Sequence, residues 1–290
     1  MRKGLILAGG LGTRLYPTTL GVSKHLFPIY DKPMIYYPLS TLMLAGIKEI
    51  AIISDSKNLR LYKKLLGNGD FFGISITYLI QNMPRGIAEA LTIGKDFING
   101  NTSALILGDN IFYGSGFVKL LENSNNHSDC CSIFLYKVRD PKNFGIALLD
   151  SDNKIVKMSE KPSNYLSDLA ITGLYFFDKN APIFCENLTK SSRNEFEIIE
   201  LLKIYQKKNL LNYELLGRGF IWFDAGTPGS LIKASNFVES LQNRQGFLMG
   251  SPEEIAFRKG WISKKDIIKR ISKFKKSFYV ENLLNYFRDN

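Results

Sequence analysis

Residues 4–15 read Gly-Leu-Ile-Leu-Ala-Gly-Gly-Leu-Gly-Thr-Arg-Leu, a short apolar run followed at once by a glycine-rich loop. The apolar run predicts a buried strand over 4–7. Glycines directly after a strand let backbone amides approach a polyphosphate, and an arginine just beyond can bind phosphate oxygens in a bidentate manner. The alternative is that the glycines only make a tight turn. The third glycine of Gly-x-Gly-x-x-Gly and the Gly-Lys-Ser/Thr of a P-loop are both missing, which disfavours dinucleotide binding and P-loop hydrolysis.

Outward from this stretch, short apolar runs alternate with helix-length segments. The pattern predicts strands over 4–7, 50–54, 74–80, 104–107 and 132–138, and helices over 36–45, 59–66, 87–97 and 117–123. Repeated βα units with strands buried on both faces are typical of a three-layer α/β fold with a mostly parallel sheet of Rossmann-like type.

The alternation of strand-like and helix-length segments ends after Asp140-Pro141. Apolar runs at 146–149 and 155–159 flank the turn-rich tetrapeptide Asp-Ser-Asp-Asn, which predicts a hairpin. A strand over 171–177 and helices over 195–207 and 230–241 follow. We therefore expect a smaller antiparallel part beside the parallel sheet.

Composition narrows the function classes. With 290 residues, 45% of them hydrophobic, the chain can bury a large core without disulfides. Its three cysteines do not form a disulfide framework or a zinc site, and its two histidines leave carboxylates as the available metal ligands. No apolar run approaches the roughly 20 residues of a membrane span. We expect a cytoplasmic protein with no membrane partner.

The formal charge of +11 is concentrated at the C-terminus. Residues 258–290 hold ten basic and three acidic side chains, which account for +7 of it. Ile267, Ile268, Ile271, Phe274 and Phe278 form an apolar stripe among the lysines, as in a helix that packs on the body or on another subunit. A nucleic-acid or membrane surface is the alternative; we expect no nucleic-acid partner.

Several further motifs follow in order. They are residues 23–35 (Ser-Lys-His-Leu-Phe-Pro-Ile-Tyr-Asp-Lys-Pro-Met-Ile), 107–110 (Leu-Gly-Asp-Asn), 160–162 (Glu-Lys-Pro), 172–175 (Thr-Gly-Leu-Tyr) and 222–227 (Trp-Phe-Asp-Ala-Gly-Thr). Together with the glycine-rich loop, they closely resemble the signature of sugar-phosphate nucleotidylyltransferases. The match is closest to bacterial glucose-1-phosphate thymidylyltransferases of the short kind and spans at least residues 3–261.

The resemblance implies that a nucleoside triphosphate, dTTP or alternatively UTP, reacts with glucose 1-phosphate in the presence of Mg²⁺. It implies a catalytic domain over 1–245, with a nucleotide half over about 1–110 and a sugar half over about 111–245, followed by a basic helical extension over 246–290. It also implies a homotetramer, with a second nucleotide site near Gly114 and Arg258.

The same resemblance assigns the site residues. Arg14 and Lys24 are expected on the triphosphate and the leaving pyrophosphate, and Lys161 on the sugar phosphate. Asp109 and Asp224 are expected to hold the metal, which suits a hard cation. Nucleotide contacts are expected from Leu7, Ala8, Gly9, Gly10, Gly12, Thr13, Gln81, Pro84, Gly86 and Asp109. Sugar contacts are expected from Gly145, Glu160, Lys161, Thr172, Tyr175 and Trp222.

Departures from the family pattern lie around the nucleotide site. Where the family usually has Pro-x-Pro-Asp-Gly-Leu-Ala-Gln, this chain has Arg85 in place of the acid and Glu89 in place of the final amide. His25 replaces a glutamine, Asn194 a glycine and Ala225 a threonine. These changes leave the base and the hexose open, with an amino or deoxy hexose phosphate as an alternative. A nucleotide-sugar sensor without activity is the non-enzymatic alternative.

Overall fold

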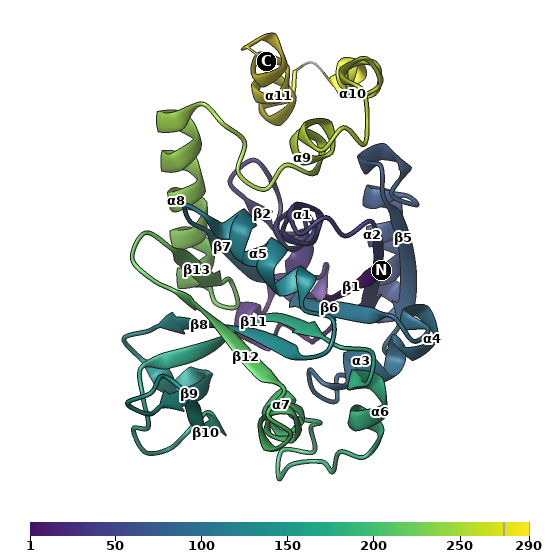
Figure 1. Ribbon diagram of the computed structural model, residues 1–290. Coiled ribbons are helices and arrows are strands. Elements are labelled where there is room, and N and C mark those ends of the chain that lie inside the picture. Colours follow the sequence, from purple (N-terminus) through teal and green to yellow (C-terminus); the bar gives the residue numbers. More distant parts are fainter. Residues whose placement is uncertain (275, 290) are drawn as a thin grey trace.

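Four parallel strands form the first half of the central sheet. The computed structural model describes residues 1–274 and 276–289, and in that part of the chain a nine-stranded mixed sheet occupies the centre (Figure 1). Strands β6 (Thr102–Leu107), β1 (Arg2–Leu7), β4 (Glu49–Ser54) and β5 (Ser75–Ile80) lie in that order, all parallel. The strand predictions for these segments are confirmed, because strands buried on both faces are apolar at nearly every position.

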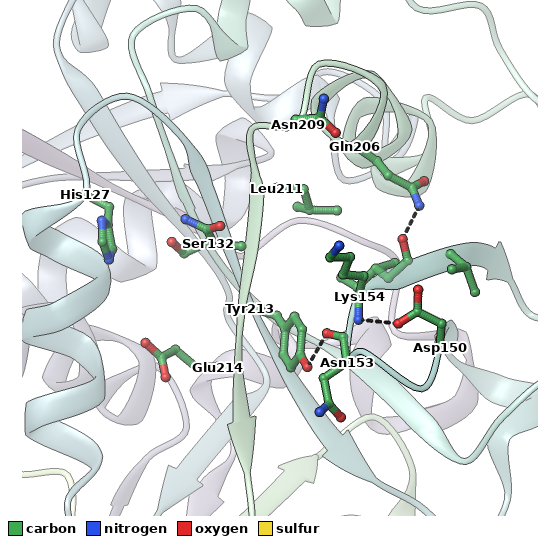
Figure 2. Close-up of a pocket in the computed structure, with 13 residues that line it drawn as sticks. His127, Ser132, Asp150, Asn153, Lys154, Gln206, Asn209, Leu211, Tyr213 and Glu214 are labelled. Atoms are coloured by element: carbon green, nitrogen blue, oxygen red, sulfur yellow. Dashed lines mark hydrogen bonds between the residues drawn. The ribbon is translucent and has the colours of Figure 1, made fainter.

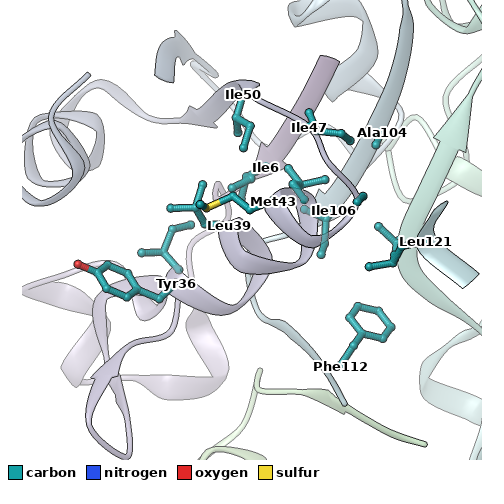
Figure 3. Close-up of a cluster of buried hydrophobic side chains, with 14 of the residues drawn as sticks. Ile6, Tyr36, Leu39, Met43, Ile47, Ile50, Ala104, Ile106, Phe112 and Leu121 are labelled. Carbon is teal, nitrogen blue, oxygen red and sulfur yellow. The ribbon is translucent and has the colours of Figure 1, made fainter. Parts of the chain in front are cut away.

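Helices cover both faces of this sheet. Helices α1 (Tyr36–Leu44), α2 (Ser56–Leu66) and α5 (Phe117–Asn126) pack on one face, whereas α3 (Glu89–Ile93), α4 (Lys95–Ile98), α6 (Ala181–Glu186) and α7 (Ile198–Lys207) pack on the other. The adjacent residues Leu5 and Ile6 of β1 are both fully buried, one in each core cluster. Figure 3 shows the cluster that contains Ile6, with Leu39 and Met43 of α1 beside it. The predicted three-layer α/β fold is confirmed.

Antiparallel strands build the second half. Strand β11 (Leu169–Phe177) pairs with β6 and also with β8 (Cys131–Lys137) and β9 (Gly145–Leu149). Strands β9 and β10 (Ile155–Glu160) form the predicted hairpin, and β12 (Leu211–Leu216) lies parallel to β8. β11 therefore joins the two halves of the molecule.

Short elements escaped the sequence prediction. Strands β7 (Asn110–Tyr113) and β13 (Ile221–Asp224) form a two-stranded antiparallel sheet, and β2 (Pro28–Ile29) and β3 (Lys32–Pro33) form a small hairpin. Short 3₁₀ turns are η1 (Thr13–Leu15), η2 (Thr18–Leu20), η3 (Lys24–Leu26), η4 (Asp70–Phe72), η5 (Pro141–Asn143) and η6 (Ser272–Phe274). Runs of two to four residues have no readable periodicity.

Two helix predictions were wrong in their bounds. The helix expected over 87–97 is interrupted at Gly94, where a Cβ would lie 3.0 Å from a methyl group of Leu5. The helix expected over 195–207 begins at Ile198, because Glu197 is extended and the amide of Phe196 pairs with the carbonyl of Arg85. By contrast, α8 (Pro228–Gln245) contains the predicted segment and begins at a capping box made by Thr227 and Ser230.

The C-terminal segment forms helices α9 (Pro252–Arg258), α10 (Lys264–Ile271) and α11 (Phe278–Asp289). They share an apolar cluster of their own that includes Ile267, Ile271 and Leu283, while α9 also packs on α1. Of the predicted stripe, Phe274 and Phe278 are instead about half exposed, at 57% and 50%. No helix in the described ranges is long and apolar enough to cross a membrane.

Candidate functional site

A cavity of about 520 Å³ opens beyond the carboxyl ends of β6 and β13. This edge of an open α/β sheet is the usual ligand position. The cavity is lined by predicted residues of three kinds, namely Arg14, Asp109, Gly145, Glu160, Lys161, Tyr175, Trp222 and Asp224. The fold therefore brings the expected phosphate, metal and sugar residues together, although they are spread over 210 positions of the chain.

The two aspartates are held side by side by backbone pairing. Asp224 ends β13 opposite Asn110 of β7, and the amide of Ala225 donates to the carbonyl of Asp109 at 3.0 Å. Burial and the charge of Asp109 raise the pKa of Asp224. One of its carboxylate oxygens, Oδ1, is buried and has no hydrogen-bond partner among the described residues. The pair is a strongly negative position with an unused ligand atom.

Two cations adjoin this carboxylate pair. Lys24 in η3 places its ammonium on Asp109. Burial alone would raise the pKa of Asp109, but Lys24 and a hydrogen bond from Asn110 lower it below its ordinary value. The guanidinium of Arg14 lies beside Asp224 at Gly226, where a Cβ would be 2.6 Å from Arg14 Nη2 and 2.7 Å from Asp224 Oδ1. A larger residue at position 226 would displace one of these two charged groups.

The glycine-rich loop runs from β1 past this pair. Gly10 and Gly12 have φ angles of +95° and +59°, which side chains other than glycine rarely adopt. At Gly9 a Cβ would lie 2.2 Å from Oε1 of Gln81, so the Gln81 amide lies directly over the loop. Of the other predicted nucleotide residues, Leu7 is half-buried, Ala8 is buried, and Thr13 and Pro84 are exposed.

On the opposite side of the cavity, residues of β9 and β10 surround Glu160. Gly145 pairs with Glu160 across the hairpin, and a Cβ there would lie 3.1 Å from Glu160 Oε2. Lys161 has a φ of +42°, a strained conformation, and its Nζ lies 3.9 Å from Glu160 Oε1. Burial raises the pKa of Glu160, and the charges of Lys161 and Arg193 offset part of this effect.

Aromatic and hydroxyl groups complete this side. Tyr175 of β11 is buried, and Trp222 donates through Nε1 to Asn110 Oδ1 at 2.6 Å. Thr172 is fully buried with an unpaired hydroxyl among the described atoms, but it does not line the cavity. Thr172 is therefore the one predicted sugar-binding residue that is not exposed to this cavity.

Two residues to which the sequence analysis assigned no role also belong to the site. Arg193 Nη2 lies 2.8 Å from Glu197 and 3.4 Å from Glu160, which places a further cation near the sugar side. Asn110 Oδ1 accepts from Trp222 and from the amide of Gly173 at 3.0 Å, and its amide group donates to Asp109. Arg193 begins the segment 193–197 (Arg-Asn-Glu-Phe-Glu), and its positive charge was the only signal for it in the sequence.

The unusual residues have local explanations. His25 is buried against Ser23 and Tyr62, and its burial, with the charge of Lys24, lowers its pKa to about 3. Asn194, in place of a glycine, has a φ of +62°, which asparagine tolerates better than most residues. Arg85 and Glu89 form an ion pair with each other at 2.6 Å. The two changes therefore compensate one another.

A larger cavity lies elsewhere. Its volume is about 630 Å³, and it lies between β12, α7 and the turn of the β9–β10 hairpin (Figure 2). Hydrogen bonds there run from Tyr213 to the carbonyl of Asn153 and from Gln206 to the carbonyl of Ile155. It contains none of the predicted site residues. A third cavity, of about 240 Å³, brings together Gly114 and Arg258.

Comparison with known proteins gives a consistent result. Residues 3–241 match the family model described as nucleotidyl transferase. The chain is 46% identical over 283 residues to a glucose-1-phosphate thymidylyltransferase of Neisseria gonorrhoeae, covering 98% of each chain. It is 47% identical over 282 residues to one of Xanthomonas campestris pv. campestris strain B100, covering 97% of this chain and 96% of the relative. A structure from Bacillus anthracis, described as a glucose-1-phosphate thymidylyltransferase in complex with a sucrose, superimposes with a TM-score of 0.76 at 37% identity, covering 82% of this chain and 95% of the other.

The geometry at Gly86 yields a stability prediction. Gly86 has a φ of +106°, and a Cβ would lie 2.4 Å from the carbonyl oxygen of Phe196. We expect Gly86→Ala to lower the free energy of unfolding by about 1–3 kcal/mol, because it combines a strained φ with a backbone overlap. Urea unfolding measures the change. Gly217→Ala, where no atom lies within 4 Å of the new Cβ, should change it by far less; equal effects would contradict this explanation.

Proposed function

The chain belongs to the nucleotidyl transferase family, and from this premise we propose that it is a glucose-1-phosphate thymidylyltransferase, which joins dTTP to glucose 1-phosphate and releases pyrophosphate. The observation that carries the proposal is the single cavity in which Arg14, the aspartate pair and the Glu160–Lys161 group meet. Support also comes from relatives of 46–47% identity that extend over nearly the whole chain.

The reaction has little need of a general base. A sugar 1-phosphate is largely a dianion near neutral pH, so one of its oxygens can attack the α-phosphorus of the triphosphate directly. The new P–O bond forms as the bond to the β-phosphate oxygen breaks, and pyrophosphate leaves with that oxygen. The difficulty is the approach of two polyanions, and catalysis therefore depends on positioning and on fixed positive charge.

We assign the positive groups by their location. Arg14 lies at the end of the glycine-rich loop and would bind the triphosphate, together with the backbone amides of that loop. Lys161 lies across the cavity and would bind the sugar phosphate, with Arg193 near it. Lys24 rests on Asp109 in this structure and would turn to the leaving pyrophosphate when the aspartates are neutralised.

A divalent cation suits the aspartate pair, and we propose Mg²⁺. Burial and the charge of Asp109 raise the pKa of Asp224, and its buried Oδ1 is a ligand atom that no described residue binds. Mg²⁺ is a hard ion that commonly binds one or two carboxylates together with phosphate oxygens. When bound, it neutralises charge on the phosphates.

The base and the sugar would be recognised through hydrogen bonds. Gln81 lies over Gly9 and offers a donor and an acceptor, which together match the imide edge of thymine or uracil. Glu160 can accept hydrogen bonds from two adjacent sugar hydroxyls, and Gly145 leaves space for the ring beside it. UTP and an amino or deoxy hexose phosphate are the competing substrates.

Assembly is a further part of the proposal. We propose a homotetramer in which the cavity at Gly114 and Arg258 is a second nucleotide site, apart from the catalytic cavity. A buried ion-pair partner, Glu254, lies 3.3 Å from Arg258 and would hold its guanidinium at the cavity rim.

The decisive experiment compares kcat/KM for dTTP, UTP, dUTP and CTP with glucose 1-phosphate and Mg²⁺. We expect dTTP to lead, with a preference over dUTP of about 10- to 200-fold if the 5-methyl group is enclosed in a fitted pocket. Nucleotide binding without release of pyrophosphate would indicate a sensor instead. UTP at or above dTTP would contradict only the thymidylyl assignment, whereas a CTP preference would contradict the role of Gln81.

The aspartates can be tested separately. Asp109→Asn and Asp224→Asn should each lower the rate of pyrophosphate release by about 10²-fold or more, because each removes a charged ligand at the point where the phosphates react. Asp152→Asn, on the exposed hairpin turn, is the control and should have the wild-type rate. Wild-type turnover of either site variant at limiting Mg²⁺ would refute the metal assignment.

Substitution of Lys161 tests which of the two substrates this residue binds. Lys161→Met should raise KM for glucose 1-phosphate by about tenfold or more, since a charged hydrogen bond to the sugar phosphate is lost, and should change KM for the triphosphate much less. Lys157→Met on the exposed side of β10 serves as the control. Equal losses for both substrates would show that Lys161 does not face the sugar phosphate.

A further inference from the structure

The two oxygens of the Glu89 carboxylate have different partners. Oε2 accepts from Nε2 of Gln81 at 2.9 Å and from the backbone amide of Arg85 at 3.2 Å. Oε1 accepts from the Arg85 side chain, at 2.7 Å from Nε and 2.6 Å from Nη2. Glu89 and Gln81 are both buried, at 5% and 4% exposure. Every one of these bonds is donated to Glu89.

A carboxylate can only accept, and this fixes the orientation of the neighbouring amide. Because Glu89 faces the amide of Gln81, that amide must direct Nε2 toward Glu89 and Oε1 toward Gly9. Turning the Gln81 amide over would set its carbonyl oxygen against the Glu89 carboxylate in a buried position. An unpaired buried acceptor is costly, so the reverse orientation is strongly disfavoured.

We propose that Glu89 is a positioning residue that sets the polarity of the base-reading amide and thereby excludes cytosine. The inference rests on the proposed function, in which Gln81 reads the base. With Oε1 directed to the site, Gln81 accepts from the N3–H of thymine or uracil while the second Nε2 hydrogen can donate to a base carbonyl. Cytosine has a lone pair at N3 and would place an acceptor against Oε1.

The paired substitutions noted in the sequence fit this role. With Arg85 as a donor, an acceptor at position 89 is required, and the carboxylate also serves Gln81. An acid at 85 with an amide at 89 would give the same direction, because the amide group would donate to the acid and its oxygen would accept from Gln81. With Arg85 and an amide at position 89, the oxygen of that amide can accept from either Arg85 or Gln81, and its NH2 group then faces the other of the two. The orientation of the Gln81 amide is then no longer fixed.

The experiment measures the ratio of kcat/KM for dTTP to that for CTP. The substitution Glu89→Gln should lower this ratio by about tenfold or more, because the Gln81 amide becomes free to turn. Adding Arg85→Asp to Glu89→Gln should restore the ratio to near the wild-type value. A merely structural role for Glu89 would lower the activity with both nucleotides and would leave the ratio unchanged.

Two single variants complete the design. Arg85→Gln retains the carboxylate and should keep the wild-type ratio; the Arg85 side chain is 49% exposed, so the change leaves the core intact. Glu186→Gln removes a carboxylate that lines the neighbouring surface cavity without contacting Gln81, and it should also keep the ratio.

The outcomes separate the two levels of the proposal. An unchanged ratio in folded Glu89→Gln, or an equal fall in Arg85→Gln, overturns the role of Glu89 while the wild-type preference for an imide base stands. Wild-type protein that releases no pyrophosphate with dTTP or UTP refutes the proposed function itself. A lowered ratio in Glu89→Gln that the added Arg85→Asp restores supports both.

Discussion

The close approach of two buried carboxylates is the constraint around which the rest of the site is arranged. Asp109 lies in the turn between β6 and β7 and Asp224 ends β13, and the pairing of β7 with β13 holds the two residues side by side. Their mutual repulsion is offset by Lys24, by the nearby Arg14 and by hydrogen bonds from Asn110. A divalent cation bound between the two carboxylates would reduce the remaining repulsion and would leave Lys24 and Arg14 available to the phosphates.

The two halves of the central sheet carry different parts of the site. Parallel strands with apolar faces hold the glycine-rich loop and Asp109, while β11 carries the antiparallel half that presents Glu160 and Lys161 across the cavity. Because β11 pairs with β6, β8 and β9, the two halves share a backbone framework and do not depend on side-chain packing alone. Site residues from both ends of the chain therefore keep their relative positions.

Elements with a strong pattern of apolar residues could be predicted from the sequence. Features that depend on contacts between residues far apart in the chain could not. The runs that became β1, β4, β6 and β11 could be identified because burial on both faces makes them continuously apolar. The break at Gly94 could not be foreseen, since it reflects the approach of Leu5 from another element. The meeting of the site residues was predicted through a family resemblance, and their individual roles stay predictions. Arg85 and Glu89 were noted as departures from the family pattern, but their ion pair, like the contact of Arg193 with Glu160, was not predicted from the sequence.

One short backbone connection links the two segments that we expect to contact the nucleotide and the sugar phosphate. The amide of Phe196 donates to the carbonyl of Arg85 at 2.6 Å, and the amide of Ala88 donates to the carbonyl of Phe196 at 3.3 Å. These two hydrogen bonds hold the segment that carries Arg193 and Glu197 against the loop beside Gln81. A substrate that fixed the position of one of these segments would therefore also act on the position of the other. If the nucleotide and the sugar phosphate bind as proposed, thermodynamic linkage requires that each would change the affinity for the other by the same factor.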